Sequence, residues 1–166
     1  MMKLAIWLDG VILKVDLTDA LYTIYKGGEA KIEFTKEIFP DSIEFISKVK
    51  ELGHEIVILS PYDKAKTEEI IKEIGLSDLK FISNEEGVTK PSKFPYEKLF
   101  RTTSWNPLEV ITVGSSPLDL LSARFYDSRI KVVCVNRFQD CSKYSPYLMG
   151  DNLIDIFNKL KRWKKL

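Results

Sequence analysis

A carboxylate at the end of the first apolar run is the residue best placed to take part in chemistry. The run Lys3–Leu8 stops at Asp9 and Gly10, and Trp7 stands two residues before the aspartate. Residues i and i+2 of a strand point the same way, so the indole and the carboxylate should face the same space. Asp9 therefore either belongs to a functional site or forms, with Gly10, the turn that follows a strand.

Three later segments also place polar residues directly after apolar runs. They are IVILS, which ends in Ser60; KPSKFPY, which begins at Lys90; and VGSSPLD, which contains Gly114, Ser115, Ser116 and Asp119. Ser60 is either a phosphate donor or a polar strand end. Lys90 either binds an anion or pairs with Asp119. The two serines precede a helix expected near Pro117, and the backbone N–H groups at a helix start favour anions.

Short apolar runs separated by amphipathic segments must position these residues. Such alternation favours an α/β fold of three layers, with a parallel sheet covered by helices on both faces. Ligands of these sheets bind beyond the carboxyl ends of the strands, which is where the polar residues lie. The predicted strands span 3–8, 55–59, 79–82, 110–113 and 130–135, with a further short strand at 31–34; the predicted helices span 16–25, 40–52, 63–74, 95–100, 118–125 and 152–163.

The composition is that of an ordinary globular protein. The chain has 166 residues, 45% hydrophobic and 30% charged, which suffices for one domain with a sizeable core. A formal net charge of +1 gives no electrostatic case for nucleic acid or an anionic membrane. No apolar run approaches the roughly 18 residues that a membrane span needs. Asp9 interrupts the first apolar stretch, so we expect no signal peptide and a cytoplasmic location.

The two cysteines lie in different contexts. Cys134 lies in the apolar run VVCV and is expected to be a core thiol, whereas Cys141 lies in a polar segment. Their spacing suggests no metal site, and two cysteines do not make a disulfide framework.

Taken in order, the four segments resemble the motifs of the haloacid dehalogenase superfamily. The motifs are Trp7-Leu8-Asp9-Gly10, IVILS, KPSKFPY and VGSSPLD, and FPDSIEFISKVKELGHEIVILS resembles the family's helix that leads into the second motif. The resemblance covers nearly the whole chain. It implies a Rossmann-like three-layer fold and, since most members are magnesium-dependent phosphatases, a phosphate site at the strand ends.

The resemblance also implies a role for each site residue. Position 7 is that of the nucleophile, and Asp9 stands where the family has its general acid. Phosphate-binding residues would be Ser60, Lys90, Gly10, Ser115 and Ser116. Magnesium would be held by the nucleophile, by a backbone carbonyl two residues on, and by a carboxylate of the fourth motif, for which Asp119 remains. Magnesium prefers oxygen ligands in octahedral geometry and usually takes one or two carboxylates.

Two positions depart from the family pattern. Trp7 replaces the nucleophilic aspartate, and Ser115 replaces the first aspartate of the fourth motif. An indole can neither attack phosphorus nor bind magnesium. Trp7 either fills a disused pocket or offers a stacking surface for an aromatic ligand such as a nucleotide base. We expect a weak or absent magnesium site at Asp119 and no cofactor, with Mg²⁺ needed only if activity remains.

Three functional hypotheses follow. The first is a pseudophosphatase that binds a phosphorylated ligand or a protein partner. The second is a slow magnesium-dependent phosphatase in which Asp9 activates water directly. The third is a structural or interaction subunit that binds no phosphate. Whether the chain is an enzyme stays open at this point.

Two segments could contact partners in a single domain spanning 1–166. Residues 11–39 lie where the family places its cap, and they are long enough only for a flap or minimal cap, which leaves the cleft open. Residues 151–166 form a basic amphipathic helix. That helix either packs on the sheet or offers a docking patch for an acidic partner or, less in keeping with the net charge, nucleic acid.

Overall fold

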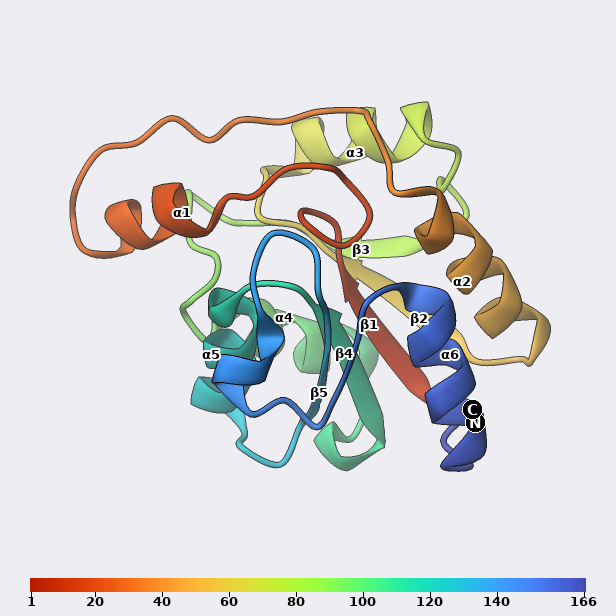
Figure 1. The fold of residues 1–166 in the computed structure, drawn as a ribbon. Helices are drawn as coiled ribbons and strands as arrows, with labels where there is room; N and C mark the ends of the chain where they lie inside the picture. Colours follow the sequence, from red (N-terminus) through yellow and green to blue (C-terminus); the bar gives the residue numbers. More distant parts are fainter.

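A parallel sheet of six strands forms the centre of the molecule (Figure 1). The computed structural model describes residues 1–166. The strand order is β3-β2-β1-β4-β5-β6, and every neighbouring pair is parallel. The strands are β1 (Lys3–Trp7), β2 (Glu55–Leu59), β3 (Lys80–Ile82), β4 (Val110–Gly114), β5 (Lys131–Val135) and β6 (Leu148–Gly150). The central strands are apolar along their length because both faces of the sheet are covered.

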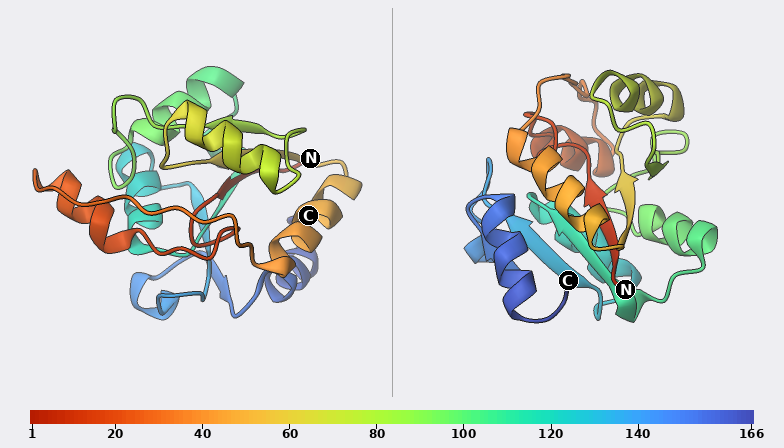
Figure 2. Two further views of the ribbon diagram at one scale, coloured as in Figure 1. Left: turned by 90° about the horizontal axis from the view of Figure 1, so that it is seen from above. Right: turned by 90° about the vertical axis from the view of Figure 1, so that its right-hand side faces the viewer.

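Helices cover both faces of the sheet, as the alternating sequence pattern predicts. They are α1 (Thr18–Tyr25), α2 (Pro40–Glu51), α3 (Lys64–Glu73), α4 (Phe94–Thr103), α5 (Pro117–Tyr126) and α6 (Leu153–Arg162), with short 3₁₀ turns at Pro107–Glu109 and Cys141–Tyr144. Helices α2 and α6 pack together on one side, and α4 and α5 on the other (Figure 2). The predicted α/β fold of three layers is confirmed. No helix has the length and apolar character needed to cross a membrane.

The segment 11–39 crosses the carboxyl end of the sheet. It contains α1 and a stretch, 28–37, without regular secondary structure, which runs across the top of the view in Figure 1. Leu17 and Leu21 anchor this segment in the core, while Tyr22 and Tyr25 are exposed. The chain leaves β1 and returns to α2 through this flap, so its residues lie next to the strand ends.

The strand expected at 31–34 is wrong, and β6 was not foreseen. Residues 31–34 are mostly exposed and have no neighbouring strand to pair with. Strand β6 has only three residues and pairs with β5 through Val133–Val135. A segment of three residues is too short to show an alternation of apolar and polar residues. It is a strand because it pairs with β5.

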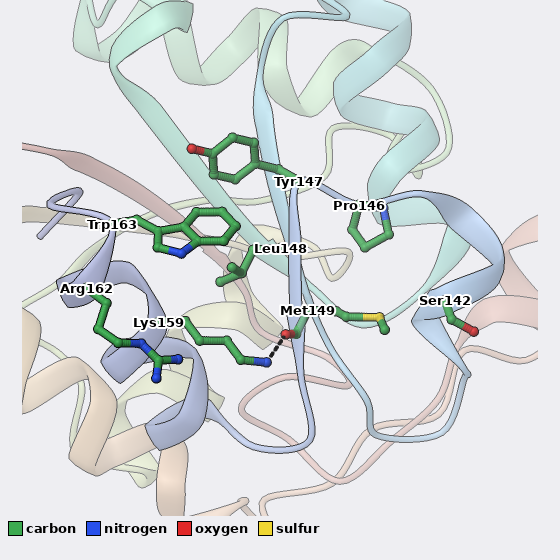
Figure 3. Close-up of a pocket in the computed structure, with 8 residues that line it drawn as sticks. All are labelled: Ser142, Pro146, Tyr147, Leu148, Met149, Lys159, Arg162 and Trp163. Atoms are coloured by element: carbon green, nitrogen blue, oxygen red, sulfur yellow. Dashed lines mark hydrogen bonds between the residues drawn. The ribbon is translucent and has the colours of Figure 1, made fainter.

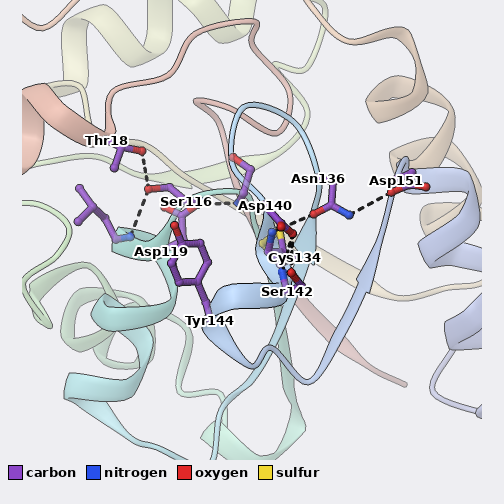
Figure 4. Close-up of a disulfide and its surroundings, with 12 residues drawn as sticks. Thr18, Ser116, Asp119, Cys134, Asn136, Asp140, Ser142, Tyr144 and Asp151 are labelled. Atoms are coloured by element: carbon purple, nitrogen blue, oxygen red, sulfur yellow. Dashed lines mark hydrogen bonds between the residues drawn. A yellow bond between two sulfur atoms is a disulfide. The ribbon is translucent and has the colours of Figure 1, made fainter.

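The expectation of unpaired cysteines is also wrong. Cys134 in β5 and Cys141 form a disulfide, with Cα atoms 6.0 Å apart (Figure 4). The backbone turns back after β5 because the Asn136 side chain accepts a hydrogen bond from the Cys141 N–H at 3.0 Å. This turn brings a residue from a polar segment into the core, where both cysteines are fully buried.

Candidate functional site

The polar residues of the four motifs meet at the carboxyl ends of β1, β2 and β4. Asp9 follows β1, and Lys90 lies in the loop after β3. The Lys90 ammonium lies 2.7 Å from Asp9 Oδ2 and 2.6 Å from Asp119 Oδ1. All three side chains are buried, with 4% or less of each exposed. Of the two alternatives considered for Lys90, the structure shows pairing with Asp119, and it adds Asp9 as a second carboxylate on the same ammonium.

The start of α5 fixes Asp119. This residue and Ser116 form a capping box, in which Asp119 Oδ2 accepts from the backbone N–H groups of Ser115 at 2.8 Å and Ser116 at 3.1 Å. A Cβ atom at Gly114 would stand 2.6 Å from the Asp119 Cβ, so glycine is required for this close approach. Both carboxylate oxygens of Asp119 are thus used within the protein.

Trp7 fills the space beside this charge cluster. Its side chain is fully buried, and the Lys90 ammonium lies 4.2 Å from the centroid of its ring. The indole N–H donates to Tyr96 Oη at 3.2 Å, and Tyr96 Oη lies 2.8 Å from Thr112 Oγ1. Thr112 in turn donates to the Ala5 carbonyl, so the chain of hydrogen bonds ends in the sheet. This network leaves no donor directed into an open site.

The charge cluster contains one cation and two carboxylates. Burial raises the pKa of the Asp9 carboxyl above its usual range, and Asp119 adds to the rise, although Lys90 acts in the opposite direction. Burial disfavours the Lys90 ammonium, but the two carboxylates outweigh it and raise the pKa of this lysine. Asp9 Oδ1 has no hydrogen-bond partner although it is buried. The Asp9 carboxyl therefore holds a proton to a higher pH than an ordinary aspartate does, because burial raises its pKa.

The Ser60 hydroxyl, the Gly10 N–H and the Ser116 hydroxyl, which were predicted to bind phosphate, are also engaged. Thr67 donates to the Asp63 carbonyl, so its Oγ1 accepts the hydroxyl hydrogen of Ser60 at 2.8 Å. The Gly10 N–H donates to the Leu13 carbonyl at 3.0 Å. Ser116 Oγ lies 2.8 Å from Thr18 Oγ1 of α1, which links the flap to the site (Figure 4).

Gly10 holds the turn after β1 in a backbone conformation that favours glycine. Its φ is +73°, in the left-handed region, and a Cβ atom there would stand 2.5 Å from Ser115 Oγ. Gly10 therefore permits the close contact between the first and the fourth motif.

The residues present do not fit a magnesium ion. No group of three or more His, Cys, Asp or Glu side chains is placed to hold a metal. Asp9 and Asp119 are the carboxylates at the strand ends, and the Lys90 ammonium occupies the position between them. A divalent cation and an ammonium would compete for the same two oxygens.

Two residues of this network were not assigned a role from the sequence. Tyr96 is the tyrosine of KPSKFPY, and Thr112 is a hydroxyl-bearing residue inside the otherwise apolar strand VITVG. A lone threonine in a strand that is buried on both faces needs a hydrogen-bond partner. That signal identifies the position but not its partner, which comes from another element.

The comparisons with known proteins agree with this fold. A model of the haloacid dehalogenase-like hydrolase family matches residues 7–125. Similar solved structures include a putative β-phosphoglucomutase from Thermotoga maritima (13% identity, TM-score 0.72, 98% of this chain and 99% of that chain). A dehalogenase with an intermediate complex has 17% identity and a TM-score of 0.75, over 96% of each chain.

A third similar structure was solved with ligands. It is D,D-heptose 1,7-bisphosphate phosphatase from B. bronchiseptica, complexed with magnesium and phosphate (15% identity, TM-score 0.72, 98% of this chain and 99% of that chain). No curated relative matches the sequence. The family match covers more than two thirds of the chain, and the chain belongs to the haloacid dehalogenase-like hydrolase family.

Proposed function

We propose that this member of the haloacid dehalogenase-like hydrolases does not transfer phosphoryl groups and acts by binding another protein. The observation that carries the proposal is the position of Lys90, whose ammonium lies 2.7 Å from Asp9 and 2.6 Å from Asp119 beside the Trp7 ring. The three charged groups of the cleft are thus bound to one another, and an indole stands where the family has its nucleophile.

The absence of a nucleophile argues against the usual two-step chemistry. A carboxylate can carry a phosphoryl group, whereas an indole cannot. The Trp7 side chain is also fully buried beside the Lys90 cluster, so no nucleophile from another residue takes its place there. Without a fitting metal site, the negative charge that spreads over a transferring phosphoryl group would lack its main counter-charge.

The alternative mechanism, in which Asp9 activates water, also finds little support. Asp9 would have to be deprotonated and within reach of water. Burial raises its pKa, its side chain is only 4% exposed, and Oδ2 is bound to Lys90. Asp9 Oδ1 has no hydrogen-bond partner but is buried, so water could reach it only if the side chains around it moved.

Binding of a phosphorylated ligand in the cleft is disfavoured for a related reason. The N–H groups of Ser115 and Ser116 are taken by Asp119 Oδ2, and the Ser60 hydroxyl is taken by Thr67. A phosphate would have to displace Asp119 and then lie next to two carboxylates. A protein partner does not need these donors, so it is the occupant we favour.

The proposal is tested by magnesium-dependent hydrolysis of an aryl phosphate. We expect the wild-type protein to show no turnover above that of an Asp9→Asn variant purified in parallel, and inorganic phosphate to leave its melting temperature unchanged. Turnover by the wild type that Asp9→Asn abolishes would instead establish catalysis through Asp9. Stabilisation by millimolar phosphate without turnover would favour a phosphorylated ligand over a protein partner.

A double substitution, Trp7→Asp/Ser115→Asp, examines the scaffold itself. It restores the two carboxylates of the family pattern, and circular dichroism checks that the fold is kept. Magnesium-dependent turnover by this variant alone would support a cleft in which only those two residues prevent catalysis. Absence of turnover from a folded double variant would mean that the Lys90 cluster blocks the site as well.

A further inference from the structure

A pocket with aromatic and basic walls lies beside the edge strand β6 (Figure 3). Strands β4 and β5 separate this edge from β1 and its charge cluster. The pocket is open to solvent and has a volume of about 400 Å³. Its lining combines Tyr147, Leu148 and Met149 of the β6 segment with Lys159, Arg162 and Trp163 at the end of α6.

The apolar part of the pocket is open to solvent. Tyr147 is 37% exposed, Met149 38% and Trp163 50%. The Tyr147 and Trp163 rings meet edge to face, with centroids 5.8 Å apart and planes at 83°. Partly exposed aromatic rings in well-formed pockets are typical anchor sites of protein interfaces, and methionine adapts to a partner's shape. This part of the pocket suits one bulky apolar side chain.

The basic part of the pocket carries unpaired charge. Arg162 makes no ion pair or side-chain hydrogen bond, and the same holds for Lys161, Lys164 and Lys165, whereas Lys159 pairs with Asp155 at 3.1 Å. Residues 153–166 hold five basic side chains and one acidic one, a formal charge of +4 in a chain whose total is +1. The rest of the chain therefore carries a formal charge of −3, so this C-terminal segment is basic in a chain that is otherwise slightly acidic.

We propose that this pocket docks an acidic segment of a partner protein. The segment would insert one apolar or aromatic side chain against Trp163 and Met149, and its flanking carboxylates would pair with Arg162 and the neighbouring lysines. An acidic segment complements the local charge of +4, and an apolar anchor complements the exposed rings. The inference is independent of whether the cleft at Lys90 catalyses.

Two other modes of binding fit the pocket less well. Nucleic acid would need ring faces on which successive bases stack, whereas Tyr147 and Trp163 are paired edge to face. Addition of a strand to β6 would need its outward backbone groups. The Gly150 carbonyl faces β5, so the carbonyl of its neighbour Met149 faces outward. The Met149 carbonyl already accepts a hydrogen bond from Lys159 Nζ at 2.9 Å.

Selection of short random peptides on the intact protein tests this inference. We expect the selected peptides to share Asp and Glu residues around one bulky apolar residue. Fluorescence anisotropy of a labelled consensus peptide should show at least about tenfold weaker binding to Arg162→Glu and to Trp163→Ser. Binding should also weaken as salt is raised from low to physiological ionic strength.

The matched control is Lys64→Glu, which reverses an exposed and unpaired lysine at the start of α3. We expect this variant to bind the consensus peptide as the wild type does. Three results would overturn the proposal: selection that yields no binders, a consensus without net negative charge, or affinity that Arg162→Glu leaves unchanged. If a single-stranded oligonucleotide bound more tightly than the consensus peptide at the same salt concentration, the pocket would instead be a nucleic-acid-binding surface. Arg162 and Trp163 are exposed, so their variants should keep the fold, which circular dichroism verifies.

Discussion

At the scale of single residues, the charge cluster at Lys90 has one negative charge in excess. Asp9 Oδ1 has no partner, and burial raises the pKa of this carboxyl. Asn at position 9 can keep its oxygen towards Lys90 while removing the excess charge. We expect Asp9→Asn to be at least as stable as the wild type at pH 7, with a gain of up to about 1 kcal/mol in the free energy of unfolding. Denaturant titration measures the difference.

The same substitution should change how stability depends on pH. The unfolded chain loses the Asp9 proton near the ordinary aspartate pKa of 3.8, whereas burial raises the pKa in the folded protein, which holds the proton to higher pH. The contribution of Asp9 to stability is therefore present below that value and is lost as the pH rises through the folded pKa. The advantage of Asp9→Asn should grow with pH over this window and then level off. An advantage that shrinks as pH rises would mean that the folded protein prefers the carboxylate.

Asp119→Asn is the matched control, because it changes the other carboxylate of the cluster. An Asn oxygen that accepts from the N–H groups of Ser115 and Ser116 leaves the NH₂ group facing the Lys90 ammonium, where Asp119 Oδ1 now lies 2.6 Å away. Two donors then oppose each other in a buried site. We expect this variant to lose about 2–4 kcal/mol of stability. Equal effects of the two Asn variants would contradict the different roles given to the two carboxylates.

At the scale of elements, the disulfide between Cys134 and Cys141 closes a short loop after β5. Within that loop, Arg137 reaches Asp41 of α2 at 2.8 Å, and Gln139 reaches Asp16 of the flap at 3.1 Å. A loop with a sequence separation of 7 gives about 2–3 kcal/mol of stabilisation in the chain-entropy treatment. Reduction should lower the stability of the wild type by that amount, once unfolding has given the reductant access to the two buried sulfurs.

The control for the disulfide is Cys141→Ser, whose stability should match that of the reduced wild type and should not respond to reductant. Alkylation under denaturing conditions without reductant, followed by mass spectrometry, counts the free thiols. We expect none in the wild type. Two free thiols in protein purified without reductant would show that the disulfide is not formed and does not contribute to stability.

The elements differ in how far the sequence alone predicts them. Strands β1, β2, β4 and β5 each consist mainly of apolar residues, and burial on both faces makes such runs recognisable in the sequence. Strand β6 and the disulfide depend on a neighbour that the turn after β5 brings close, and no local pattern records that turn. For the same reason, the sequence left open whether Lys90 binds an anion or pairs with Asp119. The sequence predicted that these residues lie at one edge of the sheet, but the contacts between them depend on side-chain packing.

At the scale of the whole molecule, α6 belongs to the core as well as to the proposed docking surface. Leu153, Ile156 and Leu160 are fully buried, and Phe157 meets Phe45 of α2 edge to face. The Leu153 N–H donates to Asp41 Oδ2 at 2.8 Å, which fixes the start of α6 against the start of α2. The basic end of the helix, by contrast, projects into solvent. One helix thus carries two separable roles along its length.

Truncation at two points should separate these roles. Each of the three buried side chains contributes about 1.5–3 kcal/mol, so a chain ending at Gly150 loses about 5–9 kcal/mol, which is comparable to the whole stability of about 5–15 kcal/mol typical of a domain. We expect circular dichroism to show that this chain is unfolded.

A chain ending at Lys161 loses mostly exposed residues and should remain folded, with a loss of less than about 2 kcal/mol in the free energy of unfolding. Because it lacks Arg162 and Trp163, it should also fail to bind the selected acidic peptides. A folded chain ending at Gly150 would show that α6 is an appended arm, whereas peptide binding by the chain ending at Lys161 would place the docking surface elsewhere.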